Sequence, residues 1–187
     1  MEKISPTRSI VITGLMAAIA VILGWTHWGF IPWFRGAALT IMHVPAIIAA
    51  VLVGPLSGVV VGLVFGIFSM IQAALAPTGP ADVWFTNPLL SILPRLFIGP
   101  TAWLVYSALK KWLAPSLFAA GAVGSLANTG LVLGMIGLLN LLPWPVLGGI
   151  ALANGIPEMI ASALITAAVV AAYWRVPIGK KQGADLD

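Results

Sequence analysis

The sequence contains no cysteine and very little charge, and each shortage excludes a class of protein. Without cysteine there is no disulfide, no thiol nucleophile and no cysteine-ligated zinc or iron–sulfur site. Only 7% of the 187 residues are charged, whereas a soluble domain carries about 25%. With 60% hydrophobic residues and a mean hydropathy of +1.07, the chain cannot cover its surface with charge. The composition therefore indicates an integral membrane protein.

Recognisable catalytic motifs are also missing. Asp82 and Glu158 are the only acids away from the two ends of the chain, too far apart to be assumed a catalytic pair. There is no Gly-x-Ser-x-Gly element of a serine hydrolase. There is also no Gly-x-x-x-x-Gly-Lys-Ser/Thr loop for ATP. We therefore expect a protein that is not an enzyme, has no cofactor or metal site, and depends on a partner if uptake requires ATP.

Long apolar runs account for most of the chain. A helix needs about 20 residues to cross about 30 Å of hydrocarbon. We expect an all-α membrane protein, a six-transmembrane-helix bundle in which residues 1–187 form a single domain. Its helices are expected at residues 8–24, 37–53, 56–75, 89–109, 115–140 and 146–174. The first run also resembles a signal peptide, but the five further apolar runs favour a retained helix.

The basic residues indicate how this bundle is oriented. Seven of the nine lie at the termini or between the fourth and fifth expected helices, on one side of a six-helix bundle: Lys3, Arg8, Lys110, Lys111, Arg175, Lys180 and Lys181. The positive-inside rule assigns this side to the cytoplasm. We therefore expect a multi-pass protein of the plasma membrane with both N- and C-termini cytoplasmic. Basic residues placed at the edges of apolar runs do not indicate a nucleic-acid-binding surface.

The opposite side carries the loops 25–36, 76–88 and 141–145. Loop 25–36 is rich in tryptophan and broken by proline, which is typical of the membrane–water boundary. We expect this loop to form an outer lid over a ligand cavity.

Polar residues within the apolar runs are few, and each is costly in hydrocarbon unless it is paired or solvated. The expected topology places most of them in the outer half of the membrane, around one outward-opening cavity. An arginine with asparagines and a histidine beneath a tryptophan-rich lid suits a small, polar, anionic ligand. The candidate substrate-binding residues are Thr40, His43, Gln72, Asn87, Arg95, Asn128, Asn154 and Glu158, with Trp28 in the lid. Two alternatives remain: His43 is a structural histidine, or Arg95 and Glu158 form a buried ion pair that joins two helices.

Small residues recur at helical spacing in two places. Glycines at positions 54, 58, 62 and 66 form one stripe of the third expected helix. Such a stripe permits close helix packing in a membrane, either inside the bundle or against another protein. Gly14 and Ala18 give the first helix a shorter small-residue face, a candidate docking surface for a membrane partner.

Several short elements resemble one family. They are Thr-x-x-His-x-Pro at residues 40–45, Pro-Arg-x-x-x-Gly at residues 94–99, Gly-Ser-Leu-Ala-Asn-Thr at residues 124–129 and Asn-Gly-Ile-Pro-Glu at residues 154–158. The chain resembles the S components, the substrate-binding membrane subunits of energy-coupling factor (ECF) vitamin transporters, from about residue 8 to residue 174. The first two elements are most similar to the pantothenate-type branch, with folate-type proteins next.

The resemblance implies a mechanism. S components bind a vitamin from outside and topple in the membrane to release it inward, docked to a transmembrane coupling protein and two cytoplasmic ATPases. Gly14 and Ala18 would correspond to the family's Ala-x-x-x-Ala docking surface, although the first position is glycine here. The alternative is a stand-alone secondary transporter of a small organic acid, coupled to protons through Glu158. A membrane enzyme is a third alternative.

Overall fold

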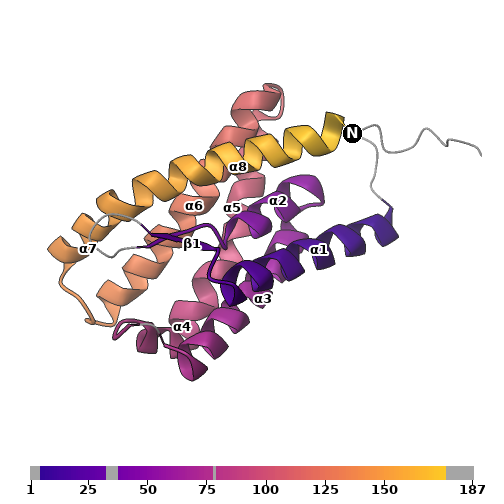
Figure 1. The fold of residues 1–187 in the computed structure, drawn as a ribbon. Helices are drawn as coiled ribbons and strands as arrows, with labels where there is room; N and C mark the ends of the chain where they lie inside the picture. The colour runs from indigo at the N-terminus through magenta and orange to yellow at the C-terminus, as the bar shows by residue number, and fades with distance from the viewer. Residues whose placement is uncertain (1–4, 33–37, 78, 176–187) are drawn as a thin grey trace, which may run out of the picture.

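The computed structural model describes residues 5–32, 38–77 and 79–175, and most of them are helical (Figure 1). Five helical segments of this described part are long and apolar enough to cross a membrane. They are α1 (Pro6–Trp25), α3 (Pro55–Leu75), α4 with α5 (Pro88–Ser91 and Leu93–Leu109), α6 (Leu113–Leu138), and α7 with η3 and α8 (Trp144–Ile150, Ala151–Gly155 and Ile156–Arg175). The expectation of a helical membrane protein is confirmed, with five candidate spans in place of the expected six.

The helix expected at residues 37–53 is shorter than predicted. Helix α2 (Val44–Leu52) has nine residues, and strand β2 (Ala38–Thr40) precedes it, paired antiparallel with β1 (Phe30–Pro32). The prediction was wrong because Pro45 lacks an N–H and is tolerated only in the first turn of a helix. At 1.5 Å per residue, α2 is about 14 Å long and cannot cross the membrane alone.

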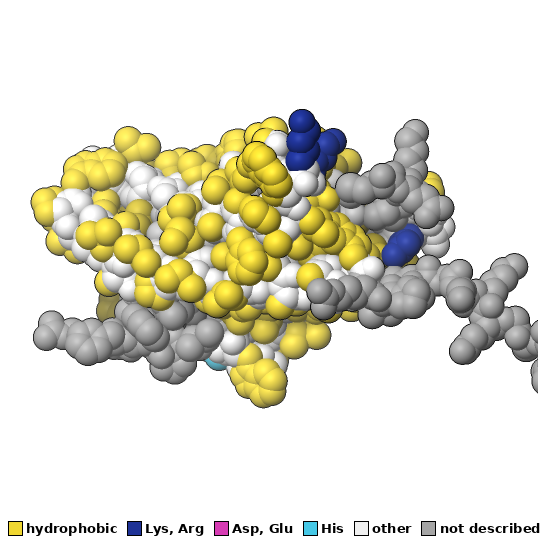
Figure 2. Space-filling model, turned by 90° about the horizontal axis from the view of Figure 1, so that it is seen from above, with side chains coloured by type: hydrophobic (Ala, Val, Ile, Leu, Met, Phe, Trp, Pro, Cys, Tyr) yellow, Lys and Arg dark blue, Asp and Glu magenta, His cyan; other side chains and the backbone are white. Residues whose placement is uncertain are grey.

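Helix α2 forms the centre of the bundle. All nine of its residues are buried, and it contacts α1, α3, α5, α6 and α8. Its apolar side chains pack with buried residues of the surrounding helices in one continuous core. The outer surfaces of the surrounding helices are largely apolar (Figure 2), as expected of helices that contact lipid.

The fourth expected helix, residues 89–109, is interrupted near its start. Helix α4 ends at Ser91 and α5 begins at Leu93, because Pro94 has no N–H to continue the regular hydrogen-bond ladder. This break positions Arg95 in the first turn of α5.

Three glycines of the predicted stripe, Gly58, Gly62 and Gly66, pack inside the bundle, whereas Gly54 precedes α3 and a Cβ there would meet nothing within 4 Å. A Cβ atom at Gly58 would lie 2.6 Å from the Cα of Gly99 in α5, and one at Gly66 would lie 2.6 Å from the carbonyl oxygen of Ser91. A Cβ at Gly62 would collide with the carbonyl group of Arg95. The missing side chains therefore allow α3 to approach the backbone of α4 and α5 directly.

The two ends of the bundle carry different segments (Figure 1). One end, toward the upper right, carries the start of α1, the connection between α5 and α6, and the end of α8, whereas α4 and α7 lie toward the opposite end. Basic side chains appear near the right-hand end of the face drawn in Figure 2. At that end the Nε of Arg8 donates to the hydroxyl of Tyr173 at 2.9 Å, which links α1 to α8. Arg8 also lies over the Tyr173 ring, 5.3 Å from its centre.

Candidate substrate-binding site

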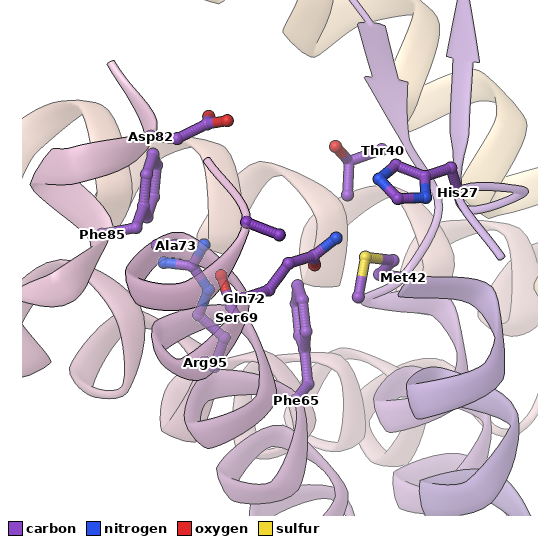
Figure 3. Close-up of a pocket in the computed structure, with 11 residues that line it drawn as sticks. His27, Thr40, Met42, Phe65, Ser69, Gln72, Ala73, Asp82, Phe85 and Arg95 are labelled. Carbon is purple, nitrogen blue, oxygen red and sulfur yellow. The ribbon is translucent and has the colours of Figure 1, made fainter. Parts of the chain in front are cut away.

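A cavity of about 390 Å³ lies between the loop after α1, β2, α3, the 3-10 helix η2 (Asp82–Thr86) and the start of α5 (Figure 3). Its walls combine charged, polar and apolar side chains. The lining residues are His27, Thr40, Met42, Phe65, Ser69, Gln72, Ala73, Ala76, Asp82, Phe85 and Arg95. Ligand pockets typically have volumes of about 300–1,000 Å³, so this cavity suits a small molecule.

Arg95 is the central feature of this cavity. Its side chain is only 5% exposed, and one guanidinium nitrogen, Nη1, donates to the carbonyl oxygen of Leu90. The guanidinium carbon lies 5.3 Å from the ring centre of Phe65 and 5.2 Å from that of Phe85. Figure 3 shows the three side chains together at the cavity wall. The Nε of Arg95 has no hydrogen-bond partner among the described residues, so the cation retains donor capacity for an anion.

Polar groups on the other walls come from four different segments: α3, η2, the loop after α1, and β2 with Thr40. Gln72 of α3 donates from Nε2 to the carbonyl oxygen of Gly24 at 3.4 Å, which ties α3 to the end of α1. The Oδ2 of Asp82 accepts a bond of 3.0 Å from the N–H of Gly79. His27 lies in the loop after α1 with a φ of 58°, a left-handed conformation that few residues adopt. The polar lining of the cavity is thus assembled from segments far apart in sequence.

Three of the predicted site residues meet in this cavity: Thr40, Gln72 and Arg95. Each is a polar residue within or next to an apolar run, the signal on which the prediction relied. Their role in binding a substrate stays a prediction.

Glu158 lies behind the cavity wall. It is 6% exposed, and its Oε1 accepts a bond of 2.7 Å from the backbone N–H of Thr40. The other oxygen, Oε2, accepts a bond of 3.2 Å from the hydroxyl of Thr129 in α6. The alternative of an Arg95–Glu158 ion pair is therefore not supported, because Glu158 makes these contacts and Arg95 bonds to Leu90 in the described part of the chain.

Five further predicted residues are not part of the cavity lining. The Nε2 of His43 lies 2.7 Å from the hydroxyl oxygen of Ser162, and Asn128 is buried with its Oδ1 unpaired among the described residues. Asn87 caps α4 through a 3.0 Å bond from the N–H of Leu89. Asn154 lies in the π-helix η3, and the side chain of Trp28 is 79% exposed. Whether these five contact a substrate also stays a prediction.

The family of the chain follows from comparison with known proteins. The model of the family "ECF transporter, substrate-specific component" matches residues 8–170. The chain belongs to this family. It is 28% identical to the pantothenic acid transporter PanT of Lactococcus lactis, an alignment that covers 91% of this chain and 95% of the relative. It is 30% identical to the pantothenate transporter PanT of Leuconostoc mesenteroides, over 95% of this chain and 96% of the relative.

The membership makes this chain an S component, a transport subunit with multiple membrane spans. The docking surface expected for its partners is on α1, where Gly14 and Ala18 are exposed on the surface of the bundle. A Cβ atom at Gly14 would meet nothing within 4 Å. This face is therefore free of intramolecular packing at Gly14, and its role in docking stays a prediction.

Sequence reasoning missed the two aromatic rings of this S component that surround Arg95. In the sequence, Phe65 is one hydrophobic residue of a hydrophobic run, and Phe85 falls in the expected loop 76–88 without a recognisable motif. A signal for Phe65 was present, because several lining residues of α3 share one helical face at spacings of three or four: Phe65, Ser69, Gln72 and Ala73. No comparable spacing identifies Phe85.

Part of the expected lid lies outside the described residues. Residues 33–37, which include Trp33 and Gly36, are among those outside the described part of the chain. Within the described part of loop 25–36, His27 contributes to the cavity lining.

Proposed function

We propose that this S component binds pantothenate in the Arg95 cavity on the outer side of the membrane, and releases it inward when docked to an ECF module. In this proposal the membrane contains six helical segments, with α2 as the short central one, and both termini are cytoplasmic. The ECF module consists of a transmembrane coupling protein and two cytoplasmic ATPases. It docks on the face of α1 that carries Gly14 and Ala18.

The buried guanidinium of Arg95 carries the proposal. An arginine at this depth is costly unless it meets an anion. In the described part of the chain its Nη1 donates to the uncharged carbonyl oxygen of Leu90, and its Nε has no hydrogen-bond partner. Pantothenate supplies one carboxylate, which an arginine recognises with paired N–H donors. Thr40, Ser69 and Gln72 line the same cavity and offer hydrogen bonds to the hydroxyl and amide groups of pantothenate.

The size of the cavity favours pantothenate over folate. A volume of about 390 Å³ is near the lower limit for ligand pockets. Folate is much the larger of the two vitamins, because it joins a pterin, an aminobenzoyl group and a glutamate. The relatives of L. lactis and L. mesenteroides, both named for pantothenate transport, support the same choice.

Tryptophan fluorescence of the purified S component provides the test. Trp84 lies in η2 between Asp82 and Phe85, so ligand binding is expected to change its emission. We expect saturable binding of pantothenate, weaker or no binding of folate, and none of pyridoxine, a vitamin without a carboxylate. Arg95→Ala should weaken pantothenate binding by about 2–5 kcal/mol, the range for truncating one partner of a buried charged pair.

Two variants serve as controls for this test. Arg95→Lys should recover only part of the affinity, because an ammonium lacks the planar fork of a guanidinium. Arg8→Ala removes an arginine at the other end of the bundle and should leave binding unchanged. Binding of pyridoxine alone, or unchanged pantothenate affinity in Arg95→Ala, would exclude the proposed role of Arg95.

Uptake into liposomes separates the S component from the stand-alone transporter. We expect pantothenate uptake only when the ECF module and ATP are both present. Uptake by this chain alone, driven by a proton gradient, would support the alternative instead.

A further inference from the structure

Glu158 connects three segments of the chain that are far apart in sequence. It lies in the first turn of α8, and its two carboxyl oxygens accept hydrogen bonds from β2 and from α6. The bond from the backbone N–H of Thr40 is the shorter one, at 2.7 Å, and the bond from the Thr129 hydroxyl measures 3.2 Å. Both oxygens are thus used within the protein.

Thr40 is the point at which this connection reaches the ligand cavity. Thr40 ends β2 and lines the cavity, and the next residue, Ile41, donates from its N–H to the carbonyl oxygen of Gly29 at 2.9 Å. Figure 3 shows Thr40 where the strands meet the cavity, next to His27 and Met42. A movement of β2 would therefore displace part of the cavity wall.

The ribbon formed by β1 and β2 depends on an external anchor. Each strand has three residues, and an isolated two-stranded ribbon is marginally stable at best. The bond from Thr40 to Glu158 joins the end of this ribbon to α8, and Thr129 joins the same carboxyl group to α6. A buried N–H that loses its acceptor costs about 1–3 kcal/mol, so this carboxyl group matters to the end of the ribbon.

We propose that Glu158 is a positioning residue that anchors the β1–β2 ribbon to α6 and α8, keeps Thr40 in the cavity wall and so slows ligand release. The proposal rests on the proposed function, because the ligand meant is pantothenate. It differs from the sequence expectation that Glu158 contacts the substrate, since Glu158 is not one of the cavity-lining residues. Breaking the Thr40–Glu158 bond is then a step in opening the site.

Two substitutions at position 158 distinguish anchoring from ligand contact. Glu158→Ala removes both hydrogen bonds. Glu158→Gln keeps a carbonyl acceptor for the N–H of Thr40, and its amide can donate to the oxygen of Thr129. A matched control is Thr166→Val, which removes another buried polar group from the same face of α8, about two turns further along.

The first measurement is hydrogen exchange of the peptide containing Thr40, in the full chain without ligand. We expect Glu158→Ala to raise exchange at Thr40 about tenfold or more, consistent with leaving a buried N–H without its acceptor. Exchange in α6 and α8 should not change. Glu158→Gln and Thr166→Val should remain within about threefold of the original protein, since both retain the acceptor for Thr40.

The second measurement is the rate of pantothenate dissociation, followed by tryptophan fluorescence. We expect about a tenfold faster dissociation in Glu158→Ala with little change in the association rate, because interface changes act mostly on dissociation. If Glu158→Ala fails to fold, Thr40→Pro tests the same bond by removing the N–H, with Thr40→Val as its control. Thr40→Pro should then release pantothenate faster than Thr40→Val.

Several results would overturn the proposal. Unchanged exchange at Thr40 in Glu158→Ala would show that the bond does not hold the ribbon. Raised exchange at Thr40 with an unchanged dissociation rate would show that the ribbon does not control ligand release. If Glu158→Gln and Glu158→Ala lost the same amount of pantothenate affinity, Glu158 would contact the ligand directly. If the original protein does not bind pantothenate, the proposed function fails, whereas exchange at Thr40 without ligand still tests the anchor.

Discussion

The side chain of Arg95 donates a hydrogen bond to the main-chain carbonyl oxygen of Leu90, five residues earlier in the chain. In a regular helix this carbonyl would accept from the N–H of residue 94, but Pro94 has none. The proline therefore creates the acceptor that orients the neighbouring arginine. Arg95 also lies in the first turn of α5, where the helix dipole disfavours a cation and favours an anion. Proline, arginine and helix start together are the features on which the proposed carboxylate site rests.

Pro94→Ala tests this relationship. An alanine can donate to Leu90 and continue the helix, so Arg95 loses its acceptor to the backbone. We expect pantothenate affinity to fall by about 1 kcal/mol, the net worth of one hydrogen bond, in a fluorescence titration. Pro100→Ala, within the same helix but more than a turn away, should bind as the original protein does. Equal affinities in all three proteins would show that the Leu90 bond does not position Arg95.

The sequence predicted the helices better than the short elements between them. Apolar runs determine where a chain can cross a membrane. The spans α1, α3, α4 with α5, α6, and α7 with η3 and α8 were therefore located to within a few residues. The helix expected at residues 37–53 was predicted too long, because the effect of Pro45 was overlooked. Strands β1 and β2 were missed because three residues are too few to show an alternating pattern.

The candidate site was predictable where a residue was chemically unusual in its surroundings. Arg95 and Gln72 stand out in apolar helices, and both line the cavity. The two phenylalanines do not stand out, because an aromatic ring beside a cation looks like any buried ring in the sequence. The contact of Glu158 with a backbone N–H 118 positions earlier follows from the folded chain and has no sequence signature.

The proposed orientation predicts which loops are accessible from outside. Because the chain has no cysteine, single cysteines give an unambiguous signal with a membrane-impermeant thiol reagent. Ala81→Cys, in the exposed loop before η2, should be labelled on intact cells, and so should Gly36→Cys in the lid. Ala114→Cys, in the exposed first turn of α6, should be labelled only after the membrane is opened. Labelling of Ala114→Cys on intact cells would contradict the proposed orientation and place both termini outside.

The docking surface predicts a separation of binding from uptake. Gly14→Trp and Ala18→Trp place a large ring on the exposed face of α1, where close helix approach requires small residues. We expect both variants to bind pantothenate normally but to lose uptake in liposomes that contain the ECF module. Leu164→Trp, a substitution at a 55% exposed residue of α8, should retain both. Lost binding in the two α1 variants would instead identify this face as internal packing.

The close approach of α3 to α5 predicts that one added methyl group disturbs the site. A Cβ at Gly62 would meet the carbonyl carbon and oxygen of Arg95, and because these are backbone atoms the two helices must separate. Overpacking of this kind costs about 1–3 kcal/mol. We expect Gly62→Ala to lower the thermal midpoint of the purified protein.

The same separation should weaken binding, because Phe65 and Gln72 on α3 would move away from Arg95 on α5. The matched control is Gly130→Ala in α6, where a Cβ would meet nothing within 4 Å. In this variant both the thermal midpoint and pantothenate affinity should be retained. If Gly62→Ala melts lower but binds as the original protein does, the packing of α3 on α5 stabilises the bundle without setting the geometry around Arg95. If both properties are unchanged, α3 and α5 are not in direct backbone contact at Gly62.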